Sequence, residues 1–214
     1  MTNQSLITLD QELVNTVVQI GVVLIIAALF YFFAGRNRGN FFNFTGIKPT
    51  TMGGIRAALI ASLILVPLSL AIFYFSPLSD AAAADNTVAG KLQANGLTGE
   101  TILLIGLIAI FKTSFSEEIF FRGILAKRLI SWMGFAVGNT LHALIFGAIH
   151  LLIFVFPGGP EFSLPVALGI GGFPALGGWI MAYINEKAGN GSIVPGWIVH
   201  ALTNLIAYPV LAFA

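Results

Sequence analysis

Long apolar segments constrain this chain more than any other feature. Six predominantly apolar stretches have roughly the length of a bilayer crossing, and they lie at 13–34, 54–75, 101–122, 134–156, 163–184 and 193–214. Hydrophobic residues make up 57% of the sequence and charged residues only 9%. An α-helix of about 20 apolar residues crosses the hydrocarbon core of a membrane. We therefore predict an all-α, polytopic transmembrane helical bundle with about six membrane spans.

The N-terminal part contributes two of these spans and a polar connection. Residues 1–12 contain no Lys or Arg, so they lack the basic region of a cleavable signal peptide, and the first apolar segment is predicted to stay in place as a helix. Residues 76–99 are rich in Ala, Asn and Gly, and we expect a loop too hydrophilic to be buried. The sequence thus divides into two N-terminal helices with a loop (1–99) and a catalytic core (100–214) within one integral membrane domain.

The distribution of basic residues predicts the orientation of the bundle. With six spans, nine of the 10 Lys and Arg residues, all except Lys91, are assigned to one side. Positively charged loops are retained in the cytoplasm, so this side is predicted to be cytoplasmic. Both termini are then extracytoplasmic, and a possible site near Glu117 lies toward the cytoplasmic side.

Three charges stand close together in Ser116-Glu117-Glu118-Ile119-Phe120-Phe121-Arg122. Glu118 precedes Arg122 by four residues, which favours an ion pair on one helix face. Consecutive helical residues point about 100° apart, so Glu117 and Glu118 are not expected to share a partner. Glu117 is then available as a general base. On charge placement alone, a structural ion pair beside a solvated glutamate is an equal alternative.

Two histidines and an asparagine favour the catalytic interpretation of Glu117 over the structural one. His150 follows a small-residue stretch in an apolar helix, and His200 and Asn204 lie one helical turn apart on the last span. Glu and His side chains can activate a water, and His and Asn can donate hydrogen bonds to an oxyanion. His142 lies eight residues before His150 without a partner motif, and we interpret it as interfacial or structural.

Helix geometry tests whether these groups can meet. At about 1.5 Å per residue, Glu117 lies about 24 Å along a span that begins at Thr101, and His200 about 10 Å along the last span. His150 lies at a comparable depth in the bundle, about 15 Å along its helix, only if that helix begins near Thr140. We therefore predict that 127–139 lies largely at the interface and does not span.

Several other chemistries are excluded by the residues present. The chain has no cysteine, no His-Glu-x-x-His motif and no Gly-x-Ser-Gly motif. Its aspartates occur only in predicted polar regions, which excludes an intramembrane aspartyl pair. No basic run indicates a nucleic-acid partner. A glutamate–histidine site remains as the candidate for hydrolysis.

Three motifs occur in order on separate spans. They are Glu117-Glu118-x-x-x-Arg122, Phe146-x-x-x-His150 and His200-x-x-x-Asn204. Over about 101–214 the chain resembles the CAAX prenyl protease and bacteriocin-processing family of integral membrane peptidases, which includes type II CAAX endopeptidases. The resemblance implies an all-helical bundle with a polar cavity open toward the cytoplasmic side, in a prokaryotic cell (inner) membrane.

The resemblance also implies roles for single residues. Glu117 and His150 would activate the hydrolytic water, His200 and Asn204 would stabilise the oxyanion, and the pair Glu118–Arg122 would orient the helix. The substrate would be a membrane-associated or lipid-modified peptide or protein, so the expected partners are that substrate and membrane lipid.

Three alternatives stay open at this point. The preferred mechanism needs no cofactor, but a divalent metal such as zinc would use Glu117, His150 and His200 as ligands. A catalytically silent family member could act as a membrane immunity or scaffold protein. A proton-coupled transporter would also place Glu, His and Asn inside a bundle.

Overall fold

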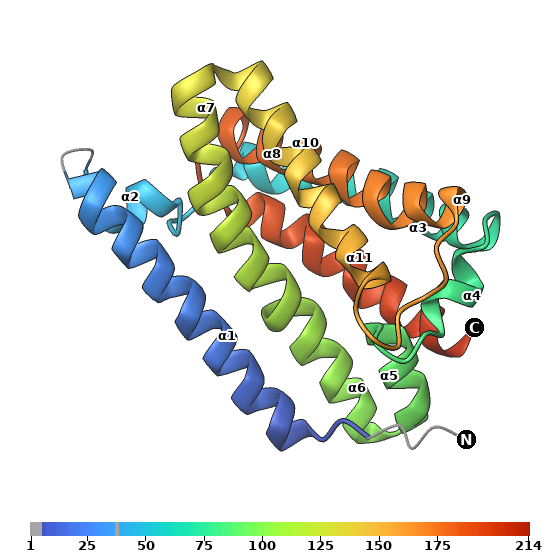
Figure 1. The fold of residues 1–214 in the computed structure, drawn as a ribbon. Coiled ribbons are helices and arrows are strands. Elements are labelled where there is room, and N and C mark those ends of the chain that lie inside the picture. Colours follow the sequence, from blue (N-terminus) through green and yellow to red (C-terminus); the bar gives the residue numbers. More distant parts are fainter. Residues whose placement is uncertain (1–5, 37–38) are drawn as a thin grey trace.

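Helices form all the regular structure that the computed structural model describes, which covers residues 6–36 and 39–214 (Figure 1). Five helices within these residues are long and apolar enough to cross a membrane. They are Leu9–Gly35, Met52–Tyr74, Phe135–Phe154, Leu164–Lys187 and Val194–Phe213. The predicted helical membrane bundle is confirmed, with five such helices where about six spans were expected.

The first two spans lie close to their predicted positions. Helix α1 (Leu9–Phe30) continues into the π-helical turn η1 (Tyr31–Gly35), and the short α2 (Phe41–Thr45) leads to α3 (Met52–Tyr74). The Thr51 hydroxyl accepts the Gly54 amide and so caps the start of α3.

The connection 76–99 is not the exposed loop expected from its composition. It contains α4 (Leu78–Ala82) and α5 (Val88–Asn95), and Leu92 is completely buried against Leu104 and Ala212. The apolar residues of α5 lie on one face of a short amphipathic helix, so they pack on the bundle while its polar residues remain outside.

One long helix continues from residue 99 to residue 133 beside α1 (Figure 1). It comprises α6 (Gly99–Gly106), the π-helical segments η3 (Leu107–Phe115) and η4 (Glu118–Ala126), and α7 (Lys127–Met133). Gly134, with φ of 77°, ends the helix, and α8 (Phe135–His150) returns along it into η5 (Leu151–Phe154). The prediction that the fourth helix begins near Thr140 is therefore wrong, since 127–139 is divided between α7 and the start of α8.

This hairpin explains why Glu117 and His150 lie at one level. Glu117 precedes Gly134 by 17 residues, and His150 follows Gly134 by 16. Both residues therefore lie about 25 Å from the turn on adjacent antiparallel helices. His150 reaches the level of Glu117 without a late start of α8, because the preceding helix extends well beyond Arg122.

The remaining helices enclose the site. The chain continues through α9 (Leu164–Ala167), the π-helical η6 (Leu168–Gly172), α10 (Phe173–Lys187) and α11 (Val194–Phe213). Helix α11 contacts α3, η3 and α10, while α8 packs on α10. A Cβ atom on Gly147 of α8 would lie 2.4 Å from the Gly171 carbonyl oxygen, so glycine is needed for this close approach.

Most described basic residues belong to elements that meet at one end of the bundle, which we call the basic end: Arg36, Lys48, Arg56, Lys127, Arg128 and Lys187. Lys127 pairs with Glu186 at 2.6 Å, and Ser192 donates to the Lys48 carbonyl at 2.6 Å. Lys112 departs from this grouping because it pairs with Glu12 near the start of α1 at 2.5 Å. Its long side chain extends along the helix toward the opposite end.

Candidate functional site

A buried ion pair lies at the centre of the site. The Glu118 Oε1 and Arg122 Nη1 atoms are 3.0 Å apart, and the two side chains are 0% and 1% exposed. The Arg122 guanidinium also lies over the Phe146 ring, 4.0 Å from its centroid. The ion pair predicted from the four-residue spacing is thus confirmed in the structure. It lies inside the bundle, where loss of either residue would leave the other charge buried without its partner.

His200 bridges the two glutamates. Its Nδ1 atom is hydrogen-bonded to Glu118 Oε1 at 3.3 Å, and its Nε2 atom lies 3.8 Å from Glu117 Oε2. The expectation that consecutive glutamates cannot share a partner is wrong here. The two imidazole nitrogens lie on different sides of the ring, so one side chain from α11 can face two carboxylates that point in different directions.

Glu117 faces the cavity described below and has no ion pair with Arg122. Its side chain is 26% exposed, whereas that of Glu118 is completely buried. Glu117 Oε2 has no hydrogen-bond partner among the described residues. The two carboxylates therefore have different surroundings, with Glu118 held by Arg122 and Glu117 accessible from the cavity.

His150 approaches the same cavity from α8. Its Nδ1 atom lies 2.7 Å from the Phe146 carbonyl oxygen, which can only accept, so Nδ1 carries the hydrogen. In the neutral ring Nε2 then has a free lone pair. The Phe146 ring contacts both His150 and His200, with centroid distances of 4.7 and 6.2 Å. Phe146 thus sets the spacing between the imidazoles of His150 and His200, the two histidines predicted as site residues.

Asn204 also lines the cavity, but its polar contacts are with a different group of residues. Its Nδ2 atom lies 3.2 Å from both Thr113 Oγ1 and Ser114 Oγ, and the Tyr208 hydroxyl lies 3.3 Å from Thr113 Oγ1. Thr113, Ser114 and Tyr208 were not predicted as site residues. The position of Tyr208, four residues after Asn204 on the same helix face, was a signal in the sequence that could have identified it.

His142 has a packing role and is not interfacial. It is completely buried, its Nδ1 atom lies 3.4 Å from Asn139 Oδ1, and its ring stacks on Phe146. Two turns of α8 separate it from His150, so it lies beneath the Phe146 ring on the side away from the cavity residues.

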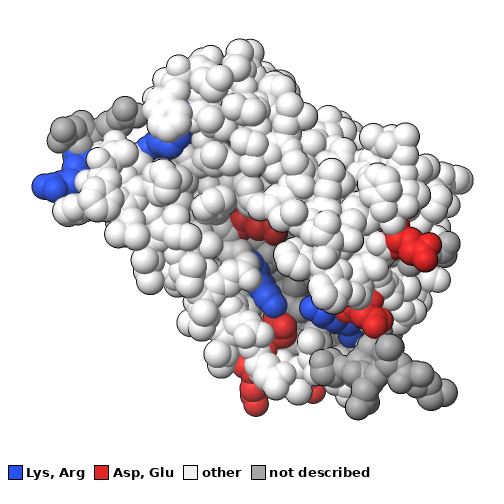
Figure 2. Space-filling model, viewed as in Figure 1, with Lys and Arg blue, Asp and Glu red and all other residues white. Residues whose placement is uncertain are grey.

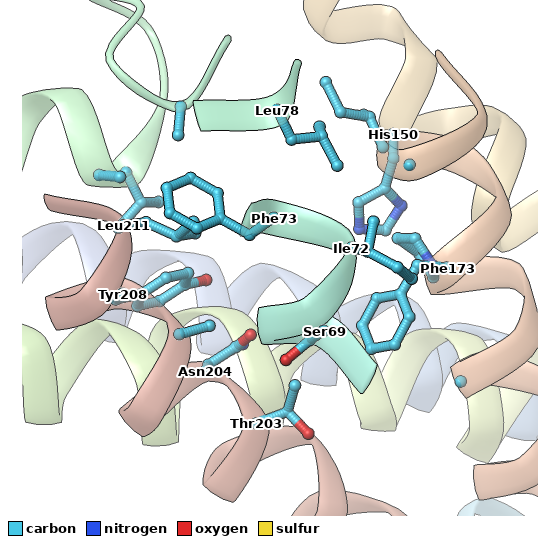
Figure 3. Close-up of a pocket in the computed structure, with 18 of the residues that line it drawn as sticks. Ser69, Ile72, Phe73, Leu78, His150, Phe173, Thr203, Asn204, Tyr208 and Leu211 are labelled. Atoms are coloured by element: carbon cyan, nitrogen blue, oxygen red, sulfur yellow. The ribbon is translucent and has the colours of Figure 1, made fainter. Parts of the chain in front are cut away.

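The cavity has a volume of about 410 Å³ and mostly apolar walls (Figure 3). Glu117, His150, His200 and Asn204 all line it, together with residues of α3, α4, α5 and α10. Asn204 and Tyr208 face it from α11, and His150 lies at another side of it (Figure 3). All four predicted catalytic residues are thus brought to one cavity.

The cavity extends away from the basic end. Its far walls include Leu78 of α4, Val88 of α5 and Leu211 near the end of α11. Toward the basic end the interior is filled by buried Arg122, Asn185 and Ile193. Figure 2 shows one largely uncharged face of the molecule, with a few acidic and basic side chains gathered in and near a hollow.

A metal site is not formed by the described side chains, since no three His, Asp or Glu residues among them are grouped to hold an ion. Glu117, His150 and His200 share the cavity, but they do not form such a group.

The fold and site define a class: an integral membrane helical protein with glutamate and histidine side chains at a cavity within the bundle. A family model described as type II CAAX prenyl endopeptidase Rce1-like matches residues 99–206. The chain belongs to this family of CAAX-type membrane proteases. Comparison with curated proteins and with solved structures gave no match. The matched region contains Glu117, Glu118, Arg122, His150, His200 and Asn204.

Proposed function

We propose that this protein is an intramembrane endopeptidase that cleaves a membrane-associated or lipid-modified peptide. The observation that carries the proposal is the convergence of Glu117, His150 and His200 on one largely apolar cavity. Ionisable groups at membrane depth are costly and usually serve a pathway or a reaction. Membership of a CAAX-type protease family favours the reaction.

Water activation would fall to Glu117 and His150. The Glu117 carboxylate takes a proton from a water that His150 Nε2 orients, and the water oxygen attacks the carbonyl carbon of the scissile bond. The carbonyl π electrons move to the oxygen and form an oxyanion. When the carbon–nitrogen bond breaks, Glu117 returns the proton to the departing amine, and a carboxylic acid and an amine are released.

Oxyanion stabilisation would fall to His200. Its Nδ1 donates to Glu118, which in turn is paired with Arg122. When the ring is protonated, its Nε2–H points to the Glu117 side of the cavity and can donate to the developing charge. Glu118 and Arg122 are then positioning residues, since they hold the imidazole at the correct angle.

The cavity suggests where the substrate lies. If the basic end faces the cytoplasm, as positively charged loops favour, then the cavity occupies the opposite half of the bundle. That arrangement favours maturation of an exported, membrane-bound peptide over processing of a prenylated cytoplasmic protein. Because the chain has no cysteine, single cysteines at Lys91 and Lys187 can test it in intact cells. We expect an impermeant maleimide to label only the cysteine at 91. Labelling of only the cysteine at 187 would show that the basic end faces outward.

The central experiment compares Glu117→Ala with the unsubstituted protein in lipid nanodiscs. The probes are a farnesylated CAAX peptide and unprenylated apolar peptides bound to lipid, with cleavage products followed by mass spectrometry. We expect Glu117→Ala to lose at least about a hundredfold in turnover, because general-base catalysis typically contributes that much or more. A Gly106→Ala variant, whose added Cβ meets no atom within 4 Å, serves as the matched control and should cleave normally.

Two outcomes would overturn the proposal. Turnover retained by Glu117→Ala would reject this glutamate as the base. No cleavage of any probe by the unsubstituted, folded protein would instead support a non-catalytic membrane role.

A further inference from the structure

The hydroxyl groups around Asn204 define the direction of its side-chain amide. Thr113 Oγ1 donates to the Ile108 carbonyl at 2.8 Å, and Ser114 Oγ donates to the Ala109 carbonyl at 2.6 Å. Each bond reaches back five residues, which matches the π-helical register of η3. Each hydroxyl has only one hydrogen, so both hydroxyls present lone pairs to Asn204.

Both amide hydrogens of Asn204 therefore have partners. The Nδ2 atom lies 3.2 Å from each of the two hydroxyl oxygens, and an amide nitrogen has two hydrogens to donate. The Tyr208 hydroxyl also donates to Thr113, at 3.3 Å, which adds to the acceptor role of Thr113. With its nitrogen held against η3, the carboxamide can offer only its Oδ1 atom to the cavity that it lines (Figure 3).

We infer that Asn204 acts as a hydrogen-bond acceptor for a peptide N–H of the bound substrate and does not donate to the oxyanion, with Thr113 and Ser114 as its positioning residues. This inference rests on the proposed peptidase function and differs from the oxyanion role that the family resemblance implies. It also names a requirement of the substrate: an extended backbone segment with a free N–H near the scissile bond.

The two roles of Asn204 differ in the kinetic constant that they change. An acceptor for a substrate N–H contributes in the bound ground state and in the transition state alike, so its loss raises KM. A donor to the oxyanion contributes mainly in the transition state, and its loss lowers kcat by about 10²–10³. For Asn204→Ala we expect KM to rise about tenfold, with kcat changed less than threefold.

A substrate series tests the acceptor role directly. Each member is the cleaved probe peptide with one non-scissile amide replaced by an ester, which removes a single N–H. We expect one ester to lose about tenfold in kcat/KM with the unsubstituted protein and to lose nothing further with Asn204→Ala, because the two changes remove the same hydrogen bond. Equal losses with both proteins for every ester would overturn the inference.

The positioning residues give a second test. The Thr113→Val/Ser114→Ala double variant removes the acceptors for the amide hydrogens, which frees Asn204 to donate to the cavity. We expect kcat/KM to fall toward that of Asn204→Ala, while Thr113→Ser retains activity. An unchanged or higher kcat in the double variant would favour the oxyanion role. If the double variant does not fold, the single Ser114→Ala variant is measured in the same way.

Failure of this inference can be distinguished from failure of the proposed function. If Glu117→Ala is inactive but Asn204→Ala loses only kcat, the peptidase proposal stands and the acceptor role is rejected. If Glu117→Ala remains active, the proposed mechanism itself is rejected.

Discussion

The two halves of the bundle on either side of His200 are built differently. Toward the basic end, polar and apolar side chains fill the interior, and Glu118, Arg122, Asn185, Ser192 and Ile193 are at most 1% exposed. On the other side, the same helices diverge around a cavity of about 410 Å³. One half therefore fixes the position of the functional groups, and the other leaves room for a substrate. Substitutions should cost stability in the first half and activity in the second.

The largest effect on stability is expected when the buried ion pair loses one partner. Arg122→Met leaves Glu118 charged and enclosed, which should lower the free energy of unfolding by about 3–5 kcal/mol. Lys127→Met, at the more exposed pair with Glu186, is the comparison variant and should cost less, about 1–3 kcal/mol. Both can be measured by denaturant titration in detergent micelles.

A second variant separates packing from charge at this pair. Replacing both charges, in Glu118→Leu/Arg122→Met, should recover part of the lost stability because no buried charge is left alone. If Arg122→Met unfolds at the same denaturant concentration as the unsubstituted protein, the contrast between the two halves fails.

Part of this site could be predicted from local spacing. The Glu118–Arg122 pair and the shared face of His200 and Asn204 follow from helix periodicity, because three- and four-residue separations bring side chains together on any α-helix. The assignment of His142 as a residue without a functional partner was also accessible, although its complete burial was not.

Other features depend on tertiary structure that spacing does not encode. The bridge from His200 to both glutamates requires the position of α11 relative to η4. The contacts of Asn204 require the π-helical register of η3, which shifts Thr113 and Ser114 relative to an ordinary helix. The level of His150 was derived from wrong helix boundaries, because the preceding helix was expected to end near Arg122 and continues to Met133.

A smaller loss of stability is expected when one methyl group is added to the filled half. A Cβ atom on Gly196 would lie 2.4 Å from Glu118 Oε2 and 2.8 Å from Asn185 Nδ2. Gly196→Ala should therefore lower the free energy of unfolding by about 1–3 kcal/mol, as overpacking does elsewhere. Gly106→Ala, where the new atom meets nothing within 4 Å, should be neutral or stabilising by up to about 1 kcal/mol. Equal stability of the two variants would show that the filled half has spare room.

The smallest change in stability is expected for added bulk in the hollow half. Ala207 lines the cavity from α11, one turn beyond Thr203. Ala207→Leu places three further carbon atoms in that space, so the free energy of unfolding should change by no more than about 0.5 kcal/mol. The cavity loses volume, however, and the KM for a farnesylated probe should rise more than the KM for an unprenylated apolar peptide, because the larger ligand needs more of the space. An equal rise for both probes would mean that the lipid group binds elsewhere. A loss of stability comparable to that of Gly196→Ala would mean that the two halves are packed alike.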